Sequence, residues 1–304
     1  MNEPILSVEG VSKSYAGRRV VDRVSFSLSH GRVMGLVGPN GAGKTTLIRI
    51  MMGILAPDEG RVRVLGGSAA ERRGRLGYLP EERGLYQKQS VQDVLRYLAK
   101  LKGMDRQACD RSLGVWLERL GLPGAATRKV RELSKGMQQK VQFIAAVLHE
   151  PDLVLLDEPL AGLDPVSRQQ LRTVLGELAE SGKTILLSSH EMAEVELLCP
   201  QVVMIHLGQM VLSGFVDAIK RDFGDHAALV RAEGDLAAVP GVLRVEPHND
   251  MTKVYLSEGC EHSEFLARAM AAGALFEHFE IALPSLEDVF VRVVQEDADE
   301  RARG

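Results

Sequence analysis

The sequence predicts an α/β fold with a mainly parallel core sheet, followed by a small α+β domain. Short apolar segments alternate with helical patterns along most of the 304 residues, as in a sheet flanked by helices. A glycine-rich loop follows directly after one compact apolar segment, residues 32–37. From Phe215 onward, 9 Lys and Arg stand against 18 Asp and Glu. This change in charge indicates a domain boundary.

The predicted sheets differ in how their strands are covered. Residues 5–11 and 20–28 come close to an alternation of apolar and polar side chains, which favours an antiparallel flank covered on one side. Continuous apolar runs at 32–37, 153–156 and 184–187 predict strands that are buried on both faces. We therefore expect a parallel core with an antiparallel β flank beside it.

The stretch from about 86 to 150 is predicted to be a helical insertion into this domain, which spans residues 1–214. Its apolar residues recur at helical spacing, at Val91, Val94, Leu95, Leu98 and Leu101, and again at Leu113, Leu117 and Leu120.

Residues 215–297 are predicted to form a separate α+β domain, and 298–304 a disordered tail. The domain is expected to contain four strands and two helices. The strands are expected at 228–232, 243–246, 253–256 and 276–283, and the helices at 263–272 and 285–294.

The composition is that of an ordinary globular protein, with 45% apolar and 26% charged residues. No apolar run approaches the roughly 18–20 residues that span a bilayer, and the N-terminus resembles no secretion signal. Three scattered cysteines argue for a reducing cytoplasm and against a disulfide or zinc framework. The net charge of −4 does not indicate a nucleic-acid partner.

The strongest local motif is the glycine-rich loop, which matches the pattern GxxxxGK[ST]. Its glycines let the backbone wrap around a phosphate, and the N–H groups of the following helix favour anions. Lys44 is expected to reach the β- and γ-phosphates, and the Thr45 hydroxyl to bind Mg²⁺. The residues expected to bind ATP here are Gly38, Pro39, Asn40, Gly41, Ala42, Gly43, Lys44, Thr45 and Thr46.

A pair of acids follows the buried segment 153–156. Because a doubly wound sheet binds ligands at the carboxyl ends of its strands, Asp157 is expected to hold Mg²⁺. Glu158 is expected to act as the general base that polarises the attacking water. An acidic turn that caps a strand is the alternative explanation for the same two residues.

A third motif resembles the LSGGQ-type signature of ATP-binding cassette (ABC) proteins. Its residues are Leu133, Ser134, Lys135, Gly136, Met137 and Gln138. Taken alone, Ser134 is a plain N-cap residue for the helix that follows it. The resemblance implies a further role, in which this helix end binds the γ-phosphate held by a second copy.

Further residues match the same family in the same order along the chain. Asp164 resembles the D-loop acid, although Asp followed by Pro is also an ordinary helix start. His190 resembles the switch histidine that contacts the γ-phosphate, and otherwise would be an ordinary histidine at a strand end. Tyr15 fits the aromatic position that stacks on adenine, with strand packing as the alternative. The resemblance covers residues 1 to about 214.

One position departs from the family pattern. The family usually has Gln after the segment 76–80, whereas this chain has Glu81. Its carboxylate can still ligate Mg²⁺, but it adds negative charge beside the γ-phosphate. The stretches 78–86 and 284–290 resemble the ABC-2, sodium-efflux-like branch, in which the ATPase pairs with a separate permease, usually for export.

The resemblance implies an ATPase subunit that uses ATP and Mg²⁺, pairs with a second cassette as a homodimer, and powers a permease on another chain. It would then lie in the cytoplasm, at the inner face of the membrane. One alternative is a soluble ABC ATPase that acts on nucleic acid or ribosomes. Another is a regulatory module in which the C-terminal domain senses a ligand. Neither the transported substrate nor the role of that domain can be predicted from these residues.

Overall fold

The computed structural model describes residues 3–82 and 84–303, and its contacts divide the chain into two units. The N-terminal unit runs to Phe215, and the C-terminal unit begins at Val216. The N-terminal unit has two sheets and the C-terminal unit one, and each unit has its own apolar core, so each is described by itself.

A six-stranded sheet forms the centre of the N-terminal unit. Its order is β5 (Leu76–Leu79), β6 (Leu153–Asp157), β7 (Thr184–Ser189), β3 (Val33–Val37), β8 (Gln201–His206) and β9 (Gln209–Phe215). All neighbours are parallel except β8 and β9. Every residue of β3, β6 and β7 is buried, which confirms the three predicted core strands. The residues that follow these strands therefore meet at one edge of the sheet.

A three-stranded antiparallel sheet is the predicted β flank. It has the order β2 (Arg18–Leu28), β1 (Leu6–Tyr15) and β4 (Glu59–Val64). Leu28 of this sheet, Leu36 of β3 and Leu47 of α1 (Lys44–Met51) belong to one buried cluster. Burying a side chain of this size contributes roughly 1.5–3 kcal/mol. This shared core fixes α1, and with it the glycine-rich loop, between the two sheets.

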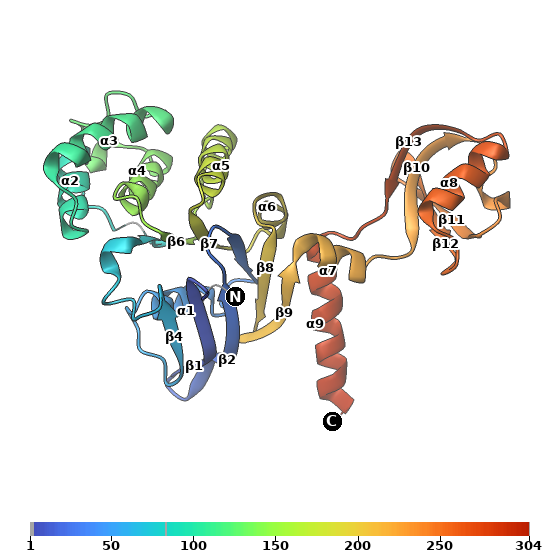
Figure 1. The fold of residues 1–304 in the computed structure, drawn as a ribbon, viewed down its shortest axis with the longest axis horizontal. Helices are drawn as coiled ribbons and strands as arrows, with labels where there is room; N and C mark the ends of the chain where they lie inside the picture. Colours follow the sequence, from blue (N-terminus) through green and yellow to red (C-terminus); the bar gives the residue numbers. More distant parts are fainter. Residues whose placement is uncertain (1–2, 83, 304) are drawn as a thin grey trace. The chain divides into compact units, whose positions relative to one another are not determined.

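The helical insertion lies between β5 and β6. It consists of α2 (Val91–Leu101), α3 (Arg106–Arg119), a 3₁₀ turn at Val130–Glu132 and α4 (Lys135–Val147), with the three α-helices grouped together (Figure 1). Trp116 of α3 and Phe143 of α4 meet edge to face at 6.3 Å, an arrangement that aromatic pairs prefer. Two further helices, α5 (Pro165–Glu180) and α6 (Met192–Leu198), follow β6 and β7.

The C-terminal unit contains a four-stranded antiparallel sheet. Its order is β11 (Val242–His248), β12 (Met251–Leu256), β10 (Ala227–Glu233) and β13 (Leu275–Ile281). The helix α8 (His262–Ala271) contributes Phe265, which is fully buried against Phe276 and Phe279 of β13. The unit also holds α7 (Val216–Asp222) and α9 (Leu286–Arg303), which contact each other.

A disordered tail was expected at 298–304, whereas the structure has a helix over most of this stretch. Helix α9 continues to Arg303, and residue 304 lies outside the described residues. The stretch is polar, which led to the expectation of disorder, but it is also rich in Ala, Glu and Arg, which are good helix formers. Here helix propensity outweighs the lack of apolar residues.

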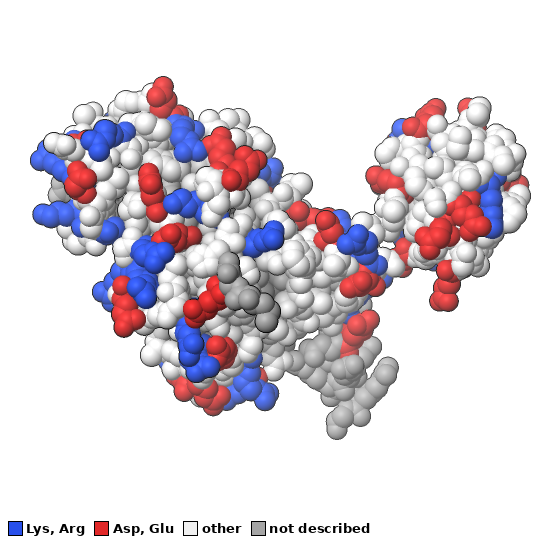
Figure 2. Space-filling model, in the orientation of Figure 1, with Lys and Arg blue, Asp and Glu red and all other residues white. Residues whose placement is uncertain are grey.

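The surface of the described residues carries charges of both signs. Basic and acidic side chains are interspersed over the N-terminal unit on the face drawn in Figure 2. Across the described part of the chain, each helix is either too short or too polar to cross a membrane.

Candidate functional site

The glycine-rich loop forms one wall of a cavity of about 260 Å³. Residues 40–46 line it together with Val20, Glu81 and Glu158. Gly43 has a φ of 107°, and a Cβ atom there would lie 2.6 Å from the carbonyl oxygen of Val20. Only glycine fits this position, because both the backbone angle and the available space exclude a side chain. The loop therefore presents backbone N–H groups and the first turn of α1 to the cavity.

Lys44 is held at the base of this cavity. It is 6% exposed, and its Nζ donates to the carbonyl oxygens of Gly38 at 2.7 Å and Pro39 at 3.3 Å. The same Nζ lies 3.4 Å from Oε1 of Glu158. The ammonium group is therefore fixed where an anion in the loop would meet it.

Asp157 and Ser188 stand side by side at the ends of β6 and β7. Ser188 Oγ donates to Asp157 Oδ1 at 2.6 Å and accepts from the backbone N–H of Glu158 at 3.0 Å. Asp157 is fully buried, and its Oδ2 makes no hydrogen bond with any described residue. Burial raises the pKa of Asp157, and the nearby hydroxyls of Ser188 and Thr45 oppose that rise only in part. A buried carboxylate oxygen without a partner is typical of a site that binds a cation.

Glu158 connects the loop with His190. Its Oε2 accepts from Nδ1 of His190 at 2.9 Å, while its Oε1 makes no hydrogen bond and faces Lys44. The backbone of Glu158 has a φ of 50°, in the left-handed region that non-glycine residues rarely adopt. Because Glu158 is 7% exposed, its carboxylate is held rigidly between a cation and an imidazole. Strain at a charged residue in a cavity is frequent at functional sites.

Glu81 brings a further carboxylate to this cavity. It follows β5, and its Oε2 accepts from Oγ1 of Thr45 at 3.4 Å. The structure thus brings the predicted residues Lys44, Thr45, Glu81 and Glu158 together in one cavity. Asp157 is linked to the backbone of Glu158 through Ser188, and His190 binds the Glu158 carboxylate.

Other predicted residues lie outside the lining of this cavity. Tyr15 ends β1, is 45% exposed, and does not line the cavity, so its stacking on adenine stays a prediction.

None of the signature residues at 133–138 lines the cavity either. Ser134 caps α4 by accepting from the N–H of Met137 at 3.2 Å, the structural role foreseen for it. A Cβ atom at Gly136 would lie 3.9 Å from Asp164 Oδ2, so these two motifs adjoin each other.

Two residues of the site were not predicted. Ser188 binds the carboxylate of Asp157 and the backbone N–H of Glu158, but no separate role was predicted for it. The only signal is its place at the end of a buried strand, in register with Asp157. Val20 lines the cavity from β2, and no local pattern marks it, because its contact with the loop depends on how two sheets pack.

Comparisons with known proteins identify the family of this chain. The family described as "ABC transporter" matches residues 21–161, and the C-terminal domain of DrrA1-3-like ATP-binding proteins matches 214–294. The uncharacterized ABC transporter ATP-binding protein YhaQ of Bacillus subtilis is 39% identical over 95% of this chain and 98% of its own length. The chain belongs to the ABC transporter ATP-binding proteins. It is therefore an ATP-hydrolysing subunit of a transporter of this kind.

Two further relatives show how much of this ATP-binding subunit is shared. A solved ATP-binding subunit of an ABC transporter is 33% identical, covers 72% of this chain and 93% of its own, and has a TM-score of 0.68. The Nod factor export ATP-binding protein I of Paraburkholderia xenovorans is 37% identical over 72% of this chain and 73% of its own length. The second family match agrees with the resemblance to the ABC-2 branch.

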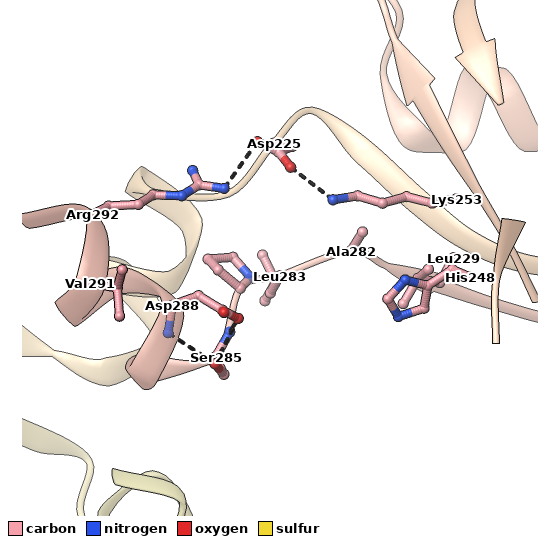
Figure 3. Close-up of a pocket in the computed structure, with 11 residues that line it drawn as sticks. Asp225, Leu229, His248, Lys253, Ala282, Leu283, Ser285, Asp288, Val291 and Arg292 are labelled. Carbon is pink, nitrogen blue, oxygen red and sulfur yellow. Dashed lines mark hydrogen bonds and ion pairs between the residues drawn. The ribbon is translucent and has the colours of Figure 1, made fainter. Parts of the chain in front are cut away.

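The C-terminal unit of this ABC subunit contains a larger groove of about 600 Å³ (Figure 3). Asp225 lies in it between two cations: Lys253 of β12 donates to Asp225 at 2.7 Å, and Arg292 of α9 lies 3.5 Å away. Asp288 accepts from the hydroxyl of Ser285 at 2.7 Å. The acids of this groove are thus bound by neighbouring side chains of the same unit.

Proposed function

We propose that this subunit hydrolyses ATP in the cavity of the glycine-rich loop, with Glu158 as the general base. Lys44 binds the β- and γ-phosphates, and Glu158 orients and deprotonates the attacking water. His190 holds the carboxylate of Glu158 and reaches the γ-phosphate. The observation that carries this proposal is the position of Glu158, whose Oε2 is bound by His190 while its Oε1 remains without a hydrogen bond.

The oxygens around Thr45 fit a magnesium ion. Asp157 Oδ2 is buried without a partner, and the Thr45 hydroxyl and Glu81 carboxylate lie 3.4 Å apart. Among the described residues, no group of three or more His, Cys, Asp or Glu side chains is arranged to hold a metal ion by itself, which suits an ion shared with nucleotide phosphates rather than a closed protein cage. When bound, Mg²⁺ would neutralise phosphate charge. We propose Thr45, Asp157 and Glu81 as its protein ligands, directly or through water.

A second copy of the chain is proposed to complete the site. The signature residues 133–138 and Asp164 lie outside the cavity that the loop lines. Ser134 caps the N-terminus of the 13-residue helix α4. Helix N-termini bind phosphate, so this helix would contact the γ-phosphate held by a partner. The two copies would form a pair with twofold symmetry and two shared ATP sites.

We further propose that the pair docks on a separate permease and powers export at the inner face of the cell membrane. The export direction rests on relatives such as the Nod factor export protein. A largely apolar groove of about 280 Å³, lined by Met52, Leu85, Leu98 and Leu101, supports a docking surface for a permease helix. The net charge of −4, together with the interspersed charges on the face drawn in Figure 2, does not favour the alternative of a nucleic-acid partner.

Substitution of the general base tests this proposal. In Glu158→Gln, the rate of ATP hydrolysis should fall roughly 10²–10⁴-fold, because an amide cannot accept the proton. The Kd for Mg²⁺–ATP should stay within a few-fold of wild type, because Gln keeps the shape of the side chain. A variant that still hydrolyses ATP at the wild-type rate would remove Glu158 from the role of base.

A further inference from the structure

Glu81 adds a negative charge to the cavity, in addition to its proposed role as a ligand of Mg²⁺. It points at the Thr45 hydroxyl at 3.4 Å, in a cavity that Glu158 also lines, and the buried Asp157 directly precedes Glu158 at the end of β6. Lys44 is the one basic residue among those that line the cavity. Two carboxylates and one ammonium thus line the place where the phosphates of ATP would bind, and Asp157 adds a third carboxylate next to Glu158.

This balance of charge disfavours a nucleotide that carries no metal. Metal-free ATP brings several negative charges into the cavity, where partial burial weakens the screening of repulsion by water. A divalent cation reverses the interaction, since it attracts the same carboxylates and neutralises phosphate charge. Glu81 differs from Asp157 and Glu158 in one respect: it is exposed, and it is neither part of the buried strand end nor bound to His190.

We propose that Glu81 makes this site selective for metal-bound nucleotide, so that the affinity for triphosphate depends on Mg²⁺ more steeply than a neutral side chain would permit. The proposal rests on the proposed function of the same cavity. Water screens the exposed charge of Glu81 in part, but a phosphate group close to it carries more than one charge, so a change of about tenfold in binding is expected and can be measured.

The test compares the full-length chain with two variants of neighbouring residues. Glu81→Gln removes the charge but keeps the shape of the side chain. Glu82→Gln makes the same change one residue further on, where the side chain is 87% exposed and pairs only distantly with Arg49, at 3.7 Å. Calorimetric titration with a non-hydrolysable ATP analogue gives the Kd in excess Mg²⁺ and in excess EDTA. The readout is the ratio of the two values, which does not depend on turnover.

We expect the ratio of the Kd in EDTA to the Kd in Mg²⁺ to fall about tenfold in Glu81→Gln and to stay at the wild-type value in Glu82→Gln. Most of the change should come from tighter binding in EDTA. An unchanged ratio in Glu81→Gln, with wild-type protein still binding the analogue, would overturn the role of Glu81 alone. A wild-type chain that binds no analogue with or without Mg²⁺ would instead overturn the proposed function.

Discussion

The two cavities of this chain differ in how their acidic side chains are held. In the cassette cavity, Asp157 and Glu158 are buried, and each has one oxygen without a hydrogen bond among the described residues. In the groove of the C-terminal unit, Asp225 and Asp288 are bound by Lys253, Arg292 and Ser285. The groove is the larger, about 600 against 260 Å³. A buried carboxylate oxygen without a hydrogen bond therefore marks the proposed ATP site better than volume does.

The pKa values of two aspartates, one in each cavity, shift in opposite directions because their carboxylates are held differently. Burial raises the pKa of Asp157, whereas the hydrogen bond from Lys253 lowers the pKa of Asp225. A raised carboxyl pKa means that the charged form costs stability in the folded protein, and a lowered one means that it contributes stability. The cassette therefore holds a charge that is unfavourable without a ligand, and the C-terminal unit holds one that supports its fold.

Truncation of a lysine in each cavity should give the largest difference between the two cavities, measured as the affinity for an ATP analogue. Lys44→Ala should weaken binding of a Mg²⁺-bound ATP analogue by roughly 100-fold, since a charged hydrogen bond contributes about 1.5–3 kcal/mol. Lys253→Ala should leave the affinity within about twofold, because Lys253 pairs with Asp225 in the other unit. Calorimetric titration of the two variants checks this. Equal losses in both would refute the distinction between the cavities.

The change Asp157→Asn should stabilise the nucleotide-free protein while it weakens Mg²⁺-dependent binding of ATP. The amide keeps an oxygen for the hydrogen bond from Ser188 and removes the buried charge. We expect a gain of about 1 kcal/mol in unfolding free energy at neutral pH. Because the pKa is raised on folding, the gain should shrink as the pH falls toward the unfolded-state value of about 3.9. Denaturant unfolding at several pH values measures it, and a loss of stability at pH 7 would argue against an unfavourable charge.

The matching change in the other cavity, Asp225→Asn, should have the opposite sign. It removes the charge that Lys253 and Arg292 share, and all three side chains are partly exposed, so we expect a loss of about 1 kcal/mol or less at neutral pH. This stability is present above the unfolded-state pKa of about 3.9 and should vanish in acid, because the folded-state pKa is lowered. The same unfolding series provides the comparison. A gain in stability would show that the ion pairs do not support the fold.

The sequence was sufficient to predict those parts of the site that are contiguous along the chain. The loop 38–45 contains its own glycines and its lysine, and Asp157 and Glu158 follow directly on a buried strand. Continuous apolar runs also predicted three of the core strands, and apolar periodicity predicted the helical insertion. Each of these features depends on neighbours within a few residues, which is the range that a pattern can describe.

The parts that the sequence could not predict depend on residues far apart in the chain. Ser188 reaches Asp157 across 31 positions, and Lys253 reaches Asp225 across 28. In the C-terminal unit the strands were predicted, but the order β11-β12-β10-β13 was not, because register and pairing follow from tertiary packing. The antiparallel pair β8 and β9, at the edge of the core sheet, also escaped prediction.

Light scattering of Glu158→Gln tests the central claim most directly, namely that Mg²⁺–ATP in the cassette cavity is enclosed by the signature helix of a second copy. With Mg²⁺ and saturating ATP, the variant should change from the mass of one chain to that of two, and Gly136→Asp in the same background should stay monomeric. A chain that binds ATP at full strength but keeps the mass of a monomer would contradict the claim.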